Sequence, residues 1–283
     1  MKKTLAFLVV TLLFLVSVGF TGLPSSVHAY SGNDTVFADR GGIFIQSFSE
    51  KIEYDTKNVD DKYLVKLGGT NPTGMPAYLD SYTNATCGII GGSNIIGGYN
   101  KIHTGLIPGF NSVGTVFGSP VWAPTGAPGG AIDTLQGDLY TRMSATPSGV
   151  TMVNYNSGMV SYFNSKSYTL TNTSMFSSGT LNLAALKAQI DQDKYATVFM
   201  AGFNIVSLLS QTGYDTQCLE EYGGAHIMSV FGYRTVKYYK NGSSSPFRTD
   251  NYLEVCTGFS ADRALLYLNN YTTINNIYVH TVS

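Results

Sequence analysis

The sequence predicts an α+β protein, with helices in the first half of the chain and an antiparallel β-sheet in the second. Before residue 191, apolar residues recur at helical spacing in several segments. From residue 227 onward, short runs rich in Val, Ile and Tyr follow one another with polar turns between them. The stretch 70–283 shows no internal repeat and no convincing linker, so we expect a single domain there.

The composition excludes one broad class of partner. The chain has 283 residues, with 17 Lys and Arg against 18 Asp and Glu, and a net charge of −1. This balance provides no basic surface for nucleic acid, so we expect no nucleic-acid partner. Only 12% of the residues are charged, whereas there are 31 Gly and 20 Tyr. Solubility must come from Ser, Thr, Asn and Tyr, which suits an extracellular protein.

The N-terminal segment has the pattern of an export signal. Lys2 and Lys3 precede an apolar run over residues 5–20, and small residues occupy positions 27 and 29. We expect a signal peptide over residues 1–29, cleavage after Ala29, secretion, and no stable membrane anchor after cleavage. An uncleaved N-terminal anchor is the alternative. Residues 30–70 then form the mature N-terminal segment or a pro-like extension, and residues 71–283 form the main domain.

The first elements are less regular than those that follow. Residues 43–45 are a short strand candidate, residues 51–65 are strongly charged and expected to be a surface connection, and residues 68–74 form a loop. The stretch 88–101 has apolar residues three and four apart, which favours a helix buried on most sides. Its five glycines are unfavourable in a helix, so a glycine-rich turn or strand pair remains the alternative.

Later elements have clearer signatures. Residues 102–130 are rich in Pro and Gly and are expected to be irregular, and helices are expected over 133–143 and 155–163. The clearest amphipathic helix covers 181–190, with Leu183, Leu186 and Ile190 on one face, followed by a buried strand over 196–201. Another short element is expected at 207–210. The expected C-terminal strands are 227–233, 236–239, 252–256, 265–268 and 277–282, with a hairpin turn or longer loop at 240–246.

The three cysteines suggest one reactive thiol. In an oxidising compartment, a Cys218–Cys256 disulfide would leave Cys87 as a thiol. Three buried, unreactive thiols are the alternative. Cys87 begins the glycine-rich helix candidate, where the helix dipole would lower the pKa of the thiol. No Cys/His grouping has the spacing of zinc ligands, so we expect no metal and no cofactor.

A histidine far along the chain complements this cysteine. His226 enters an apolar, strand-like run after Gly223-Gly224-Ala225. A Cys and a His that are distant in sequence but adjacent in the fold are the pair used by thiol acyl-transfer enzymes. Taken alone, His226 could be an ordinary strand histidine. His103 and His280 have no supporting context and are expected on the surface.

Three stretches resemble the papain-like cysteine peptidase superfamily, and within it the C39-like group of secreted bacterial cysteine peptidases. Residues 84–88 (Asn-Ala-Thr-Cys-Gly), with the apolar run and Tyr99 that follow, are similar to the nucleophile helix of that group. Residues 224–233, ending in Gly-Tyr, are similar to its histidine strand, and residues 252–259 resemble the next strand. The resemblance implies a helical half that carries the Cys helix, packed against an antiparallel sheet half.

The resemblance also implies a function and roles for particular residues. The protein would be a secreted peptidase that cleaves peptide or protein substrates through a Cys87–His226 thiolate–imidazolium pair and a thioacyl intermediate. The residue that orients the histidine is an Asn or Asp in the family and Thr257 here, where the hydroxyl could accept the bond. The oxyanion glutamine of the family corresponds to Ser81, and Asn84 is the only nearby side-chain amide.

Because positions 257 and 81 differ from the family pattern, two other functions remain as alternatives to a peptidase. A catalytically inactive papain-like surface or binding protein would also tolerate Thr257 and Ser81. A related acyl transferase, which uses an amine instead of water, has the same sequence pattern.

Overall fold

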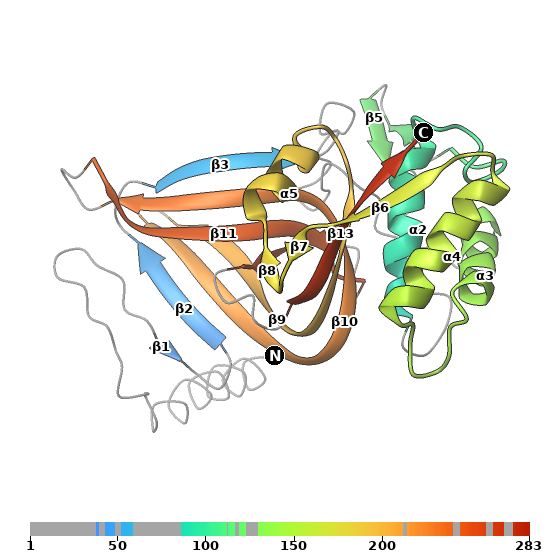
Figure 1. The fold of residues 1–283 in the computed structure, drawn as a ribbon. Helices are drawn as coiled ribbons and strands as arrows, with labels where there is room; N and C mark the ends of the chain where they lie inside the picture. The colour runs from blue at the N-terminus through green and yellow to red at the C-terminus, as the bar shows by residue number, and fades with distance from the viewer. Residues whose placement is uncertain are drawn as a thin grey trace, which may run out of the picture.

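The computed structural model describes residues 86–111, 113–116, 119–122, 130–211, 214–239, 244–258, 263–268 and 274–283, together with three strands at 38–39, 43–48 and 52–58. The fold is a mixture of helices and antiparallel sheet, as predicted. Three helices, α2 (Cys87–Asn100), α3 (Gly130–Arg142) and α4 (Met152–Ser165), gather on one side of the molecule, beside the strands (Figure 1).

Helix α2 confirms the helical prediction for this segment and excludes the turn or strand-pair alternative. Every residue from Gly88 to Asn100 is buried. Two of its glycines allow close packing: a Cβ on Gly88 would lie 3.2 Å from Ile227, and one on Gly98 would lie 2.5 Å from the Tyr195 ring. The cost of glycine in a helix is therefore offset by close contact with the sheet and with neighbouring aromatic rings.

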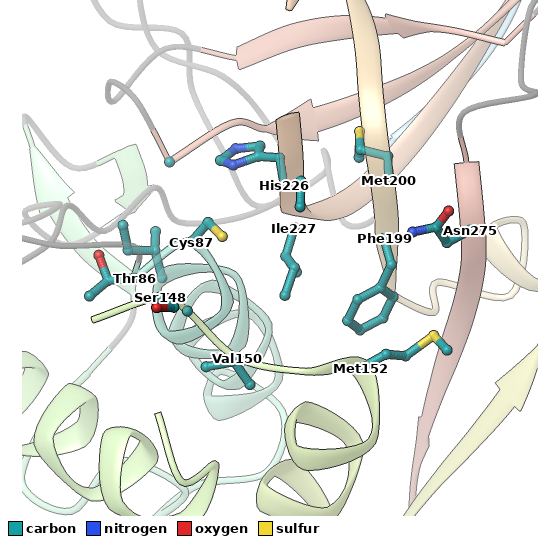
Figure 2. Close-up of a pocket in the computed structure, with 14 residues that line it drawn as sticks. Thr86, Cys87, Ser148, Val150, Met152, Phe199, Met200, His226, Ile227 and Asn275 are labelled. Atoms are coloured by element: carbon teal, nitrogen blue, oxygen red, sulfur yellow. The ribbon is translucent and has the colours of Figure 1, made fainter. Parts of the chain in front are cut away.

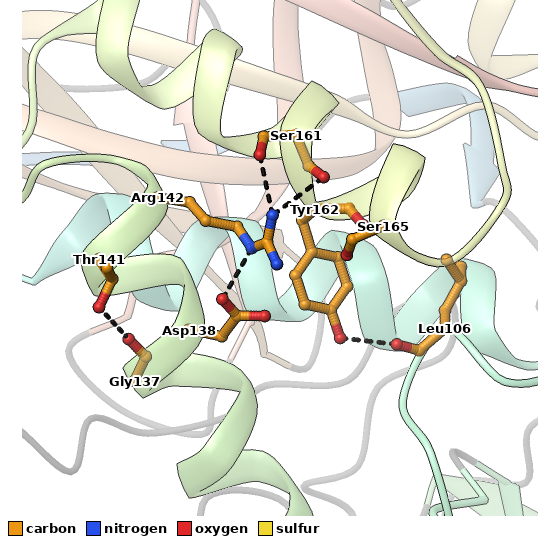
Figure 3. A network of polar contacts seen from close by, with 8 residues as sticks. All are labelled: Leu106, Gly137, Asp138, Thr141, Arg142, Ser161, Tyr162 and Ser165. Carbon is orange, nitrogen blue, oxygen red and sulfur yellow. Dashed lines mark hydrogen bonds and ion pairs between the residues drawn. The ribbon is translucent and has the colours of Figure 1, made fainter.

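Helices α3 and α4 cover the other side of α2. The Cβ position of Gly92 lies 3.0 Å from both Met143 and Met159, which belong to this helical layer. Arg142, at the end of α3, joins the two helices: its Nε is 2.7 Å from Asp138, and its guanidinium donates to the main-chain and side-chain oxygens of Ser161 (Figure 3). Tyr162 then donates to the carbonyl of Leu106, which ties the segment after α2 to α4.

Four antiparallel strands close on one another to form the centre of the sheet. They are β9 (Ala196–Gln211), β10 (Tyr214–Tyr239), β11 (Pro246–Cys256) and β12 (Arg263–Tyr267). The pairings β9–β10, β10–β11, β11–β12 and β12–β9 make a ring. Strand β13 (Ile274–Val282) pairs with the start of β9, and β6 (Leu170–Ser174) pairs with β13.

Shorter elements complete the described structure. Strands β1 (Ala38–Asp39), β2 (Ile43–Phe48) and β3 (Ile52–Asn58) fall within residues 30–70, and β2 and β3 both pair with β10. Two small hairpins are β4 (Val113–Val116) with β5 (Ser119–Trp122), and β7 (Phe176–Ser177) with β8 (Thr180–Leu181). Helix α5 (Leu183–Ile190) contacts β10, where Lys187 hydrogen-bonds to Thr235.

Several element predictions need correction. The segment 51–65 contains strand β3, which pairs with β10, rather than only a surface connection. The two strands expected at 227–233 and 236–239 belong to the single strand β10, and 207–210 continues β9. The segment 102–130 contains a hairpin as well as irregular turns.

A buried chain of hydrogen bonds crosses the interface between helices and sheet. Tyr155 of α4 contacts Thr197 Oγ1 of β9 at 2.8 Å, and Thr197 contacts Nε2 of His280 at 2.7 Å. Nδ1 of His280 lies 2.7 Å from Asn172 Oδ1. His280 is fully buried rather than on the surface, and burial lowers its pKa to about 3. The ring is therefore neutral near pH 7.

The predicted Cys218–Cys256 disulfide is absent. Cys256 is a buried residue with a reduced thiol. Its Cα pairs with that of Ser229, whereas Cys218 lies earlier on β10, opposite Ile45 and Ser207. Because Cys218 lies eleven residues before Ser229 on β10, its Cα does not have the separation of about 4–7 Å from that of Cys256 on β11 that a disulfide requires. The side chain of Cys218 lies outside the described residues.

Two further expectations concern the N-terminus and membranes. The signal peptide over 1–29 lies outside the described residues, as does the 70/71 domain boundary. Within the part of the chain that the structure describes, no helix has the length and apolar character needed to span a bilayer.

Candidate active site

Cys87 is the first residue of α2 and is partly exposed. The first turn of α2 lies against β10, because Gly88 lets the helix approach Ile227: a Cβ on this glycine would be only 3.2 Å from the Ile227 side chain. The main-chain N–H of Ile227, the residue that directly follows His226, lies close enough to the Cys87 thiol to lower its pKa.

A β-bulge sets the position of His226. Gly223 pairs with Gly202 and His226 pairs with Met200, so β10 has one more residue than β9 across this interval. Gly224 adopts a positive φ of 101°, which glycine accepts without the steric cost of a side chain. Bulges next to active sites commonly redirect a side chain. Here the irregularity immediately precedes the histidine.

Two contacts fix the plane of the His226 ring. Nε2 lies 2.7 Å from the main-chain oxygen of Thr257, and the ring stacks on Phe203 with centroids 5.2 Å apart and an interplanar angle of 24°. A carbonyl oxygen only accepts hydrogen bonds, so Nε2 carries the proton of the neutral ring. Nδ1 is then the basic atom, and it is the atom suited to take a proton from a thiol.

Thr257 thus orients the histidine through its backbone. The sequence predicted that the Thr257 hydroxyl would accept the imidazole N–H, and this part of the prediction is wrong: the acceptor is the carbonyl. The following residue, Gly258, has a positive φ of 79°. It lies against Ile90 of α2: a Cβ on Gly258 would be 3.5 Å from the nearest atom of the Ile90 side chain. A tight turn after β11 therefore holds the carbonyl in place.

Burial keeps both reactive groups close to neutral. Desolvation raises the pKa of Cys87, although N–H groups of Ile227, Gly88 and Cys87 itself act in the opposite direction. Desolvation likewise lowers the pKa of His226. The hydrogen bond to the Thr257 carbonyl raises this pKa, but by less. Both shifts disfavour a resting thiolate–imidazolium pair. The expectation that the start of the helix would lower the Cys87 pKa is therefore wrong, because desolvation is larger than the effect of the N–H groups.

Cys87 and His226 line the same pocket, which has a volume of about 440 Å³ (Figure 2). One wall comes from a tight turn around Ser148 and Val150, and another comes from Met200 of β9. Most of the lining side chains are apolar. An acyl group held in such a pocket would lie beside a thiol and a histidine whose ring is fixed in orientation.

Ser81 and Asn84, expected near the oxyanion, lie outside the described residues. Among the residues described, no group of three or more His, Cys, Asp or Glu is arranged to hold a metal ion.

Sequence reasoning missed three residues of the site. Phe203 stacks on the histidine, Gly258 shapes the turn after Thr257, and Asn275 lines the pocket from β13. The Gly223-Gly224 pair is a recognisable signal for the bulge before His226. Phe203 and Asn275 have no local signal, because their positions depend on pairing between strands that are distant in sequence.

Comparison of the chain with protein-family models, with curated proteins and with solved structures finds no match.

Proposed function

We propose that this protein is a papain-like cysteine peptidase that is exported and cleaves peptide bonds. The observation that carries the proposal is the shared pocket: Cys87 at a helix start, and His226 with its Nε2 held by the Thr257 carbonyl. A thiol, an imidazole and a group that orients the imidazole are the components of nucleophilic acyl transfer. The three stretches that resemble the papain-like superfamily include the same two residues.

The proposed mechanism begins with a neutral pair. His226 Nδ1 takes the proton of the Cys87 thiol as the sulfur attacks the peptide carbonyl, and a C–S bond forms. The carbonyl electron pair moves to oxygen, where the main-chain N–H of Cys87 at the start of α2 would stabilise the negative charge. The C–N bond then breaks, and the imidazolium gives its proton to the departing amine.

Water completes the cycle. His226, neutral again, removes a proton from water as the hydroxide attacks the thioester carbon. The C–S bond breaks, the acid product leaves, and the thiolate recovers the proton from the imidazolium. Attack by an amine in place of water would give transfer rather than hydrolysis, as in the acyl transferase alternative.

A second candidate function is favoured by the pKa shifts. Since burial moves the pKa values of Cys87 and His226 away from an ion pair, the same pocket could bind a peptide without cleaving it. A non-catalytic binding protein of this fold would retain the pocket and show no turnover.

Peptide hydrolysis tests the proposal. The mature protein is incubated with a diverse synthetic peptide library, and the products are identified by mass spectrometry. We expect cleavage by the wild type, and a loss of at least about 100-fold in Cys87→Ala and in His226→Ala, as expected for removing a nucleophile or a general base. Cys256→Ala and His103→Ala are matched controls that should remain active.

The outcomes separate the two functions. Binding of peptides without cleavage would support the binding protein and overturn the peptidase. Cleavage that persists in Cys87→Ala would also overturn it. For export, the N-terminus of the secreted protein should be Tyr30 if cleavage follows Ala29.

A further inference from the structure

Asn275 occupies an irregular position at the edge of the pocket. On β13, Ile274 pairs with Met200 and Asn276 pairs with Phe199, so Asn275 is the additional residue of a β-bulge. The pocket is therefore bordered by two bulges, one before His226 on β10 and one at Asn275 on β13, on either side of β9. A bulge changes the direction of a side chain relative to a regular strand.

The two neighbouring asparagines behave differently. The Oδ1 of Asn276 accepts hydrogen bonds from Ser174 Oγ and from the N–H of Ile277, each at 2.8 Å, and these bonds hold the bulge. Asn275 is exposed and lines the pocket, and no other described residue hydrogen-bonds to its carboxamide. Figure 2 shows this carboxamide on the side of the pocket formed by Phe199 and Met200.

The strand pairings give the spacing between Asn275 and the reactive pair. Met200 has His226 as its partner on one side and Ile274 as its partner on the other. Adjacent strands lie about 4.8 Å apart, so the two flanking backbones are about 10 Å apart. An extended peptide covers that distance in about three residues. Asn275 therefore borders the part of a bound peptide that lies two or three residues from the reacting carbonyl.

We infer that Asn275 is a substrate-positioning residue, whose carboxamide hydrogen-bonds to the main chain of a peptide bound across the pocket. A primary amide carries both a donor and an acceptor, so it can bond the C=O and the N–H of one residue in an extended peptide, which point to the same side of the chain. Its neighbours Phe199 and Met200 are apolar, and a few polar groups in an apolar pocket commonly fix the orientation of a ligand. The inference rests on the proposed peptidase function.

The test compares reagents that share one target but differ in peptide content. Iodoacetamide, iodoacetyl-trialanine amide and acetyl-trialanyl chloromethyl ketone all alkylate Cys87, but only the last two carry peptide, on opposite sides of the reacting carbon. Rates are measured at pH 8.5 for the wild type, Asn275→Ala, Asn275→Gln and the control Asn164→Ala, which removes an amide from an exposed position on α4.

We expect Asn275→Ala to lower the rate of one peptidyl reagent by about 3- to 10-fold, the effect of losing one or two neutral hydrogen bonds. The iodoacetamide rate and the melting temperature should not change, because neither requires a bound peptide. Asn275→Gln should recover part of the loss, and Asn164→Ala should match the wild type. The reagent that is affected shows which side of the scissile bond contacts Asn275.

Failure of the inference and failure of the proposed function give different results. If the wild type cleaves peptides but Asn275→Ala leaves the rates of both peptidyl reagents unchanged, the inference alone is overturned. If the wild type cleaves no peptide and neither peptidyl reagent reacts faster than iodoacetamide, the peptidase function fails, and the role of Asn275 in it fails too.

Discussion

The imidazole of His226 is oriented by the main-chain oxygen of Thr257, at 2.7 Å from Nε2. Because the acceptor is a carbonyl, the side chain at position 257 should have little effect on catalysis. We expect Thr257→Val to keep kcat within about 3-fold of the wild type, since the hydrogen bond that sets the tautomer is retained. Steady-state peptide hydrolysis measures this, and a 100-fold loss would instead assign the role to the hydroxyl.

The companion variant is Gly258→Ala, which alters the backbone beside that carbonyl. An alanine would be strained at φ 79°, at a cost of about 1–2 kcal/mol, and the turn would shift to relieve the strain. We expect kcat to fall more than in Thr257→Val, with the NMR signal of the Nε2 proton displaced. Equal activity in the two variants would show that the turn tolerates the change without moving the carbonyl.

The pH dependence of Cys87 alkylation reports the charge state of the resting pair. Burial raises the pKa of this thiol, so the thiolate should form only above the ordinary cysteine value of about 8.5. We expect the iodoacetamide rate to rise through that region, with no plateau near pH 6. The profile should be nearly the same in His226→Ala, because the imidazole with its lowered pKa is neutral at these pH values. A plateau below pH 6 that disappears in His226→Ala would establish an ion pair instead.

Helix α2 should respond oppositely to alanine at two of its glycines. A Cβ on Gly98 would lie 2.5 Å from the buried Tyr195 ring, so Gly98→Ala should lower the free energy of unfolding by about 1–3 kcal/mol. A Cβ on Gly91 meets nothing closer than 3.7 Å, so Gly91→Ala should be neutral or stabilising by up to about 1 kcal/mol through helix propensity. Urea unfolding compares the two, and equal destabilisation would contradict the packing argument.

His280 should make the fold sensitive to acid. Its pKa is about 3 in the folded protein and close to 6.5 when unfolded, so below pH 6.5 the unfolded chain binds more protons. Its contribution to stability is complete above about pH 6.5 and is lost progressively as the pH falls toward 3, at no more than about 1.4 kcal/mol per pH unit. Unfolding measured from pH 8 to pH 4 should show this slope in the wild type, and His280→Gln should reduce it. The same slope in both proteins would assign the acid sensitivity to other groups.

The sequence predicted the general class of the fold because periodicity is local. The helix at Cys87, the helices near 135 and 155, and the strand run from 227 are all visible in patterns of a few residues. The length of β10, the strand β3 and the position of His280 depend on pairing between distant segments. Local patterns do not specify such pairing, and those predictions were wrong for that reason.

The candidate site was predictable only in part. Cys87 and His226 could be named from residue type and context, whereas the direction of their pKa shifts depends on burial, which the sequence does not show. The position of Asn275 depends on a bulge in one strand and its pairing with another. The two adjacent asparagines at 275 and 276 indicate neither the bulge nor the strand pairing.

An acceptor supplied by the backbone changes how a site of this kind can vary. Every amino acid has a main-chain oxygen, so substitutions at position 257 preserve the His226 contact as long as the chain keeps its path through Gly258. The group that orients the histidine is then determined by the conformation of a turn rather than by the identity of a side chain. Proteins with this arrangement could share a working site while showing only a Cys and a His in common.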